Sequence, residues 1–111
     1  MEERKPNNPE PQGKPDEEKM PKALFELGEI FITPGALITV DVNEQHPVQF
    51  LARHVVGDWG NLHEEDIETN RRSLKHNGSI LSVYDLDSGG RIYIITEWDR
   101  SVTTLLTPDE Y

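Results

Sequence analysis

The order of apolar and polar residues along the chain predicts short secondary-structure elements from the first quarter of the sequence onward. An apolar segment predicts a strand at about 28–32. The stretch that follows, 34–41, is ambiguous. Thr33 and Pro34 suit the start of a helix, whereas the β-branched residues after them favour a strand. Both possibilities remain open for this stretch.

Two helices are predicted in the middle of the chain. Residues 47–56 begin with a proline and carry one apolar stripe at helical spacing, and Gly57 follows as a terminator. Residues 62–76 begin with acids and end with bases, an order that complements the helix dipole. We predict that Asn61 caps this second helix, with Glu64 completing a capping box. Its apolar face is thin, which predicts a surface helix.

Three strands are predicted at the end of the chain, over 80–84, 91–96 and 102–106. The apolar run 92–95 is unbroken, which predicts burial on both faces, and the turn signal at 87–90 predicts a hairpin. The expected fold is α+β: a small antiparallel sheet of three to four strands packed against two to three helices.

Composition divides the chain near residue 22. The first 22 residues contain five prolines and no large apolar residues except Met1 and Met20, which predicts a disordered tail. Residues 23–111 are predicted to form a single domain. They hold 15 acids and 6 bases, a net charge of −9, whereas the tail contributes only −1.

Composition also excludes several classes of function. The chain has no Cys, and therefore no disulfide, no thiol nucleophile and no cysteine zinc site. It shows no membrane span, no secretory signal and no phosphate-binding or dinucleotide-binding motif. The acidic domain disfavours direct binding of nucleic acid. We predict a cytoplasmic protein with no cofactor, no metal and no contact with a membrane.

His54, Asp58 and Trp59 lie at and just after the end of the first clear helix. One interpretation makes His54 an acid–base group that Asp58 orients. The other makes His54 a buried histidine beside Trp59 in the core. We favour the second interpretation, because no nucleophile accompanies the histidine.

Glu64, Glu65 and Asp66 gather at the start of the second helix. Consecutive helical residues point in different directions, so we interpret them as a solvated acidic helix start that is available to a partner, and not as a metal site. The acids at 85–89 resemble the opening of a calcium loop. The twelfth position of such a loop falls on Thr96, which lacks the required carboxylate, so a hairpin turn is favoured.

Glu97, Trp98, Asp99 and Arg100 follow the most apolar strand. Charged residues at a strand end are candidates for a binding loop. The favoured alternative is structural, with Arg100 forming ion pairs with nearby acids. An exposed Trp98 would be a natural contact for a partner.

Several short motifs between Leu24 and Tyr111 carry a resemblance to a known family. They are Thr33-Pro34-Gly35-Ala36-Leu37, Phe50-Leu51-Ala52-Arg53-His54, Gly57-Asp58-Trp59-Gly60, Ile95-Thr96-Glu97, Asp99-Arg100-Ser101 and Leu105-Leu106-Thr107-Pro108-Asp109-Glu110-Tyr111. The chain resembles small uncharacterised bacterial proteins that are often found on plasmids and other mobile elements. Some are labelled type I restriction enzyme subunits, but 111 residues cannot hold a methyltransferase. The segment 41–46 and Trp98 depart from the family pattern, and the resemblance implies no activity.

Three hypotheses follow. The preferred one is a non-enzymatic module that binds a protein partner, in its strongest form an acidic inhibitor that mimics nucleic acid and occupies a restriction or CRISPR nuclease. The second is a small enzyme or ligand-binding domain. Its pocket would be lined by His54, Asp58, Glu97, Asp99 and Arg100. The third is an oligomeric regulatory module, for example a homodimer, with a symmetric interface formed by the helix 62–76 and an exposed sheet edge.

Overall fold

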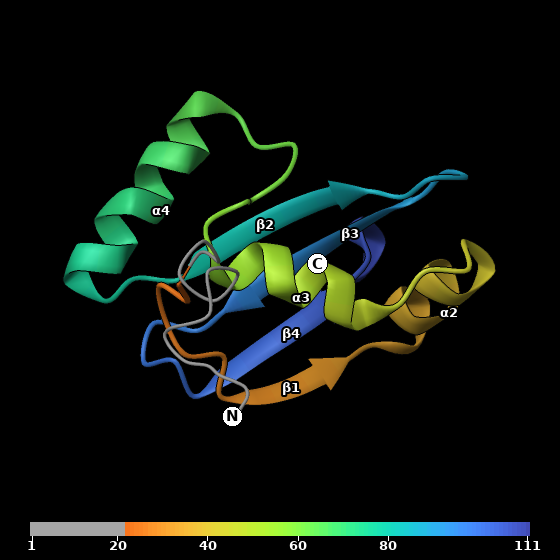
Figure 1. Cartoon of the computed structure of the whole chain (residues 1–111), viewed down its shortest axis with the longest axis horizontal. Helices are drawn as coiled ribbons and strands as arrows, with labels where there is room; N and C mark the ends of the chain where they lie inside the picture. The colour runs from red at the N-terminus through yellow and green to blue at the C-terminus, as the bar shows by residue number, and fades with distance from the viewer. Residues whose placement is uncertain (1–21) are drawn as a thin grey trace, which may run out of the picture.

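The computed structural model describes residues 22–111 (Figure 1). The predicted tail, 1–22, lies outside the described residues except for Lys22. The elements are β1 (Glu29–Ile32), α2 (Pro34–Val42), α3 (Pro47–Val55), α4 (Glu64–His76), β2 (Ile80–Asp85), β3 (Arg91–Thr96), β4 (Val102–Leu106) and a short 3₁₀ helix, η1 (Pro108–Glu110). Three helices and a four-stranded sheet confirm the α+β class.

The sheet has the strand order β1-β4-β3-β2. The pairs β2–β3 and β3–β4 are antiparallel, as expected, but β1 runs parallel to β4. The sheet is therefore mixed and not wholly antiparallel. The reason is that β1 and β4 are joined by a long crossover that contains three helices and two strands, and only a crossover of this length lets neighbouring strands run parallel.

Local capping explains the helix boundaries. The ambiguous stretch is helix α2: Pro34 occupies its first turn, and the Thr33 hydroxyl accepts a hydrogen bond from the Ala36 N–H at 3.2 Å. Helix α3 begins at Pro47, as predicted. The predicted cap of α4 is wrong, because the helix starts at Glu64, after His63. Asn61, the residue expected as the cap, does not cap the helix. Its backbone N–H bonds the Val83 carbonyl of β2 instead.

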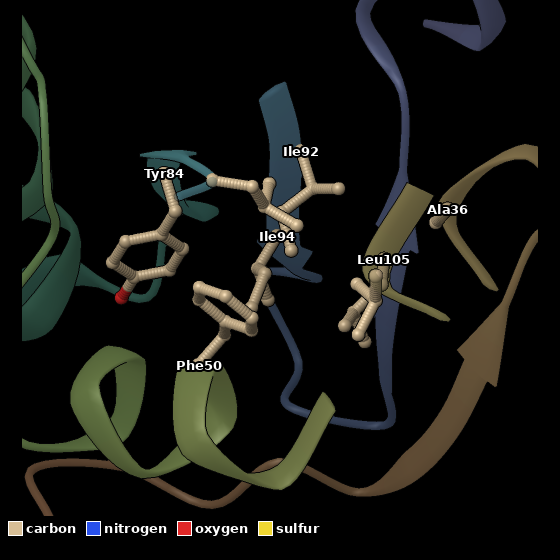
Figure 2. Packing of buried hydrophobic residues seen from close by; sticks show 8 residues of the cluster. Ala36, Phe50, Tyr84, Ile92, Ile94 and Leu105 are labelled. Atoms are coloured by element: carbon tan, nitrogen blue, oxygen red, sulfur yellow. The ribbon is translucent and has the colours of Figure 1, made fainter. Parts of the chain in front are cut away.

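The core lies between one face of the sheet and the helices α2 and α3 (Figure 1). Figure 2 shows Phe50 of α3 directed toward the side chains of Tyr84 and Ile94, and its ring centroid lies 5.5 Å from that of Tyr84. The expected burial of β3 on both faces is wrong. Ile92 and Ile94 are fully buried, but Tyr93 on the opposite face is only half-buried, because α2 and α3 cover one face alone.

The two edges of the sheet differ. Val83 of β2 donates to the Trp59 carbonyl at 3.0 Å and accepts from the Asn61 N–H at 2.7 Å, so a loop covers this edge. Gly60 sits between them with a φ of +76°, and a Cβ there would lie 2.0 Å from the Val83 carbonyl oxygen. Only glycine permits this close approach. At the other edge, no segment of residues 22–111 pairs with the outer side of β1.

Candidate functional site

A chain of side-chain hydrogen bonds crosses the covered face of the sheet, starting from His54 of α3. The histidine is fully buried. Its Nδ1 lies 2.6 Å from the Ser82 hydroxyl and its Nε2 lies 2.9 Å from the Thr96 hydroxyl. Thr96 contacts the Thr103 hydroxyl at 2.7 Å, and Thr103 donates to the Leu27 carbonyl at 2.6 Å. The imidazole therefore joins α3 to three strands and to the segment before β1.

The direction of these hydrogen bonds determines the tautomer of His54. The Leu27 carbonyl can only accept, so it takes the single hydroxyl proton of Thr103. Thr96 must then donate to Thr103, and its oxygen accepts from Nε2–H of the histidine. Nδ1 consequently accepts from Ser82. The ring is neutral, and its burial lowers the pKa of His54 to about 4.

Asp58 does not orient His54, so the orienting role considered for this carboxylate is wrong. Its carboxylate accepts two hydrogen bonds from Arg53, at 2.8 Å from Nε and 3.1 Å from Nη2. These hydrogen bonds lower the pKa of the Asp58 carboxyl. The Arg53 guanidinium also lies 4.5 Å from the Tyr84 ring centroid. The ion pair of Arg53 and Asp58 thus anchors the end of α3. The hydrogen-bond partners of the His54 ring are the hydroxyl groups of Ser82 and Thr96.

Trp59 is buried, in agreement with the interpretation that places it and His54 in the core. Its backbone covers the edge of β2, as described above. The indole Nε1 is buried without a hydrogen-bond partner in the part of the chain that the structure describes. Phe25 and His54 pack in a T-shaped arrangement, with 5.1 Å between their ring centroids.

The turn between β3 and β4 holds the second group of candidates. Arg100 does not pair with acids there, and that expectation is wrong. Its guanidinium donates to backbone carbonyls of Gly78 at 2.6 Å, of Ser73 at 3.0 Å, and of Glu97 and Trp98, each at 3.1 Å. Carbonyl oxygens satisfy the guanidinium because the end of α4 packs beside this turn. The arginine is therefore a structural tie between α4 and the turn.

The other side chains of this turn face solvent. Glu97 is exposed, and Asp99 accepts hydrogen bonds from the Ser101 hydroxyl at 2.6 Å and its N–H at 3.1 Å. The Trp98 side chain is 61% exposed, as a partner contact requires. The groups proposed for one catalytic pocket therefore divide into a buried histidine, an anchoring ion pair and a solvent-facing turn.

The acids Glu64, Glu65 and Asp66 form the exposed first turn of α4, as expected for a solvated helix start. Within residues 22–111, no three His, Asp or Glu side chains are placed to hold a metal ion together. The acids at 85–89 belong to the β2–β3 hairpin, as predicted. Its turn is closed by the Leu86 N–H, which donates to the Gly90 carbonyl at 3.0 Å.

An apolar groove, which the sequence interpretation missed, lies where β1, α2 and the start of α3 meet. We call it the β1 groove; its volume is about 520 Å³. It is lined by Ile30, Ile32, Leu37, Val40, Asp41, Gln45, His46, Pro47, Val48 and Leu51. Leu37 and Val48 are 52% and 60% exposed, although both are large and apolar. Such a cluster on a protein surface is typical of an interaction site.

Helix α2 contained a signal that could have revealed this groove. It is apolar on nearly all sides but buries only Ala36 and Val40, while Leu37, Ile38 and Val42 remain exposed. A helix that is apolar all round is normally buried. The sequence of α2 was ambiguous because the helix carries more apolar residues than it buries in the core.

The segment that contributes the residues of the β1 groove is acidic. Residues 23–52 contain Glu26, Glu29, Asp41 and Glu44 but no Lys or Arg. All four acids are exposed, and none forms an ion pair with another residue in the described range. The apolar lining is therefore set in a segment with a net charge of −4.

No helix within the described residues is long and apolar enough to cross a membrane. Comparisons of the chain with protein-family models, with curated proteins and with solved structures found no match. The resemblance to small proteins of mobile elements therefore stays a prediction.

Proposed function

We propose that this chain is a non-enzymatic module that binds a protein partner. The observation that carries the proposal is the β1 groove, in which large aliphatic side chains are exposed together within a segment of net charge −4. Aliphatic side chains gain free energy when a partner covers them, at about 25 cal/mol per Å² of apolar surface removed from water. The surrounding acids favour partners with a complementary charge.

The buried histidine supports a binding function over catalysis. A general base has to reach the proton that it abstracts. Both ring nitrogens of His54 are occupied by hydroxyl groups, and the side chain has no exposed surface. Asp58 and Arg100 are engaged in structural contacts as well. Three of the five residues of the alternative pocket are thus used to hold the fold together, and the other two, Glu97 and Asp99, face solvent.

The finer form of the proposal is an acidic inhibitor that occupies the nucleic-acid groove of a restriction or CRISPR nuclease. The domain charge of −9 and the exposed acids of the first turn of α4 support it. A pull-down against such nucleases at rising salt tests it, because carboxylates that replace phosphates bind less tightly when screened. Binding that ignores ionic strength contradicts the mimicry.

Site-specific cross-linking tests the general proposal. A photoreactive amino acid replaces Val48 in the β1 groove or, as the control, Lys75 on exposed α4. Each full-length variant is irradiated in a lysate of the organism that encodes the chain. A discrete protein adduct formed from position 48 and not from position 75 supports a binding module. The absence of any adduct at position 48 contradicts it.

A further inference from the structure

We propose that the β1 groove accepts an extended basic segment of a partner protein, which adds to the sheet as a fifth strand beside β1. This inference rests on the proposed function and specifies its binding mode. Strand addition uses backbone hydrogen bonds for affinity and alternate side chains for specificity. The edge, the groove and the local charge each support it.

Within residues 22–111, the backbone of β1 has one hydrogen-bonded side and one unpaired side. The Glu29 N–H donates to the Ser101 carbonyl at 2.9 Å, and the Thr33 N–H donates to the Leu105 carbonyl at 3.0 Å. Successive residues of a strand direct their backbone groups to opposite sides. The N–H and C=O groups of Ile30 and Ile32 therefore point away from β4, toward the open edge.

The opposite edge of the sheet offers no such place. Asn61 and Trp59 bond the backbone of Val83, and the Asn70 side chain bonds that of Leu81. Edge strands are normally protected against unwanted pairing. In the described chain that protection is built at β2, while β1 lies unpaired at the other edge of the sheet (Figure 1). The Ile30, Phe31 and Ile32 side chains of β1 are exposed.

The groove lies on the side to which alternate side chains of an added strand would point. Ile30 and Ile32 are paired with Thr103 and Leu105, whose side chains face the core. They consequently face the same side as α2 and α3, and both line the groove. An incoming strand would place every second side chain beside Ile30, Ile32 and Val48, so an aliphatic residue is expected at those positions.

Charge selects the partner. The segment 23–52 has four acids and no base. A second copy of the chain would bring two such segments together, and like charges across an interface are unfavourable. Lysine or arginine at the remaining alternate positions of an incoming strand would point to the opposite face of the sheet, where Glu29 lies at the edge. The favoured occupant is therefore an extended segment in which aliphatic and basic residues alternate.

A synthetic probe tests this binding mode. The probe is a fluorescently labelled peptide of about seven residues, a length that spans a typical strand, with lysine and valine in alternation. Its anisotropy is followed on titration with the full chain. Replacement of the lysines by glutamates should weaken binding at least about tenfold. N-methylation of the backbone on one side of the peptide should abolish binding, and N-methylation on the other should have little effect.

Two protein variants localise the contact. Val48→Lys places a cation in the groove, and Ile38→Lys places the same charge on exposed α2 outside it; their side chains are 60% and 62% exposed. Thermal unfolding confirms that each variant folds. Val48→Lys should weaken peptide binding at least about tenfold, and Ile38→Lys by no more than about threefold.

Four results would overturn the inference. Three are equal binding of the glutamate peptide, indifference to N-methylation on both sides, and sedimentation of the full chain as a dimer that buries Val48. The fourth is failure of the peptide to bind. If position 48 still yields a protein adduct in that case, the strand-addition mode is wrong while the binding function stands. If no adduct forms, both are wrong.

Discussion

The side-chain amide of Asn70 bonds both backbone groups of Leu81. Its Nδ2 donates to the Leu81 carbonyl at 2.7 Å, and its Oδ1 accepts from the Leu81 N–H at 3.0 Å. One residue of α4 thus supplies the donor and the acceptor that a neighbouring strand would otherwise provide. Asn70 itself is buried, so these hydrogen bonds are well shielded from water.

Asn70→Ala should lower the free energy of unfolding by about 2 kcal/mol, because it leaves a shielded backbone donor and acceptor without partners. Urea unfolding at neutral pH measures the change. Glu65→Ala, an exposed position on the same helix, is the control and should differ from the wild type by less than about 0.5 kcal/mol. Equal stability of the two variants would contradict the role of Asn70.

His54 should make the protein less stable as the pH falls below 6.5. Burial lowers the pKa of this residue to about 4, so the unfolded chain binds a proton that the folded chain rejects. Its contribution is complete above the unfolded pKa of about 6.5 and is lost as the pH falls toward 4. Urea unfolding should show a loss of about 2 kcal/mol between pH 7.5 and pH 5.

His54→Gln provides the matched comparison. A glutamine amide can accept from Ser82 and donate to Thr96, as the neutral imidazole does, but it does not titrate. This variant should fold, and its free energy of unfolding should change much less between pH 7.5 and pH 5 than that of the wild type. A change as large as that of the wild type would show that another group is responsible.

Glu110 should stabilise the protein mainly above pH 4.5. Hydrogen bonds from the Thr33 hydroxyl, and then from the Thr107 and Gly35 backbones, lower the pKa of its carboxyl to about 2. The contribution is present above the ordinary value of 4.5 and is lost as the pH falls toward 2. Glu110→Gln should have a lower melting temperature than the wild type at pH 6, and the difference should shrink near pH 2. A constant difference would argue against the charged carboxylate.

Arg100→Lys should destabilise the fold by about 1–3 kcal/mol, because an ammonium group cannot reach the four carbonyls that the guanidinium bonds. Thermal or urea unfolding measures this loss. Arg72→Lys is the control, since Arg72 is exposed and, within residues 22–111, its side chain hydrogen-bonds the Thr69 hydroxyl alone, at 3.3 Å. If both lysine variants are equally stable, the guanidinium is not a tie between α4 and the turn.

Short-range signals predicted most of the secondary structure. The apolar stripe of α3, the hairpin between β2 and β3, and the end of α4 at Asn77 depend on residues that are close in sequence. The start of α4 was misplaced because Asn61 fits a capping pattern equally well. Its N–H bonds Val83 of β2 instead, at 2.7 Å, and only the tertiary structure brings that strand beside it.

The candidate site was predicted less well. His54 was recognised as a buried histidine, but its partners Ser82 and Thr96 are distant in sequence, and their hydroxyl groups carry no local signal. Arg100 was paired with acids on the basis of proximity along the chain. The structure gives it carbonyls from the end of α4, which lie more than 20 residues away in the sequence.

By itself, the sequence determined the α+β class, the acidic character of the domain and the positions of its main helices and strands, because periodicity and composition act locally. Tertiary structure alone decided the parallel pairing of β1, the protection of one sheet edge and the exposure of the other. These features depend on which distant segments compete for the same backbone groups. The β1 groove belongs with them: Ile32 and Val48 become neighbours only when α2 and α3 fold back over the strand.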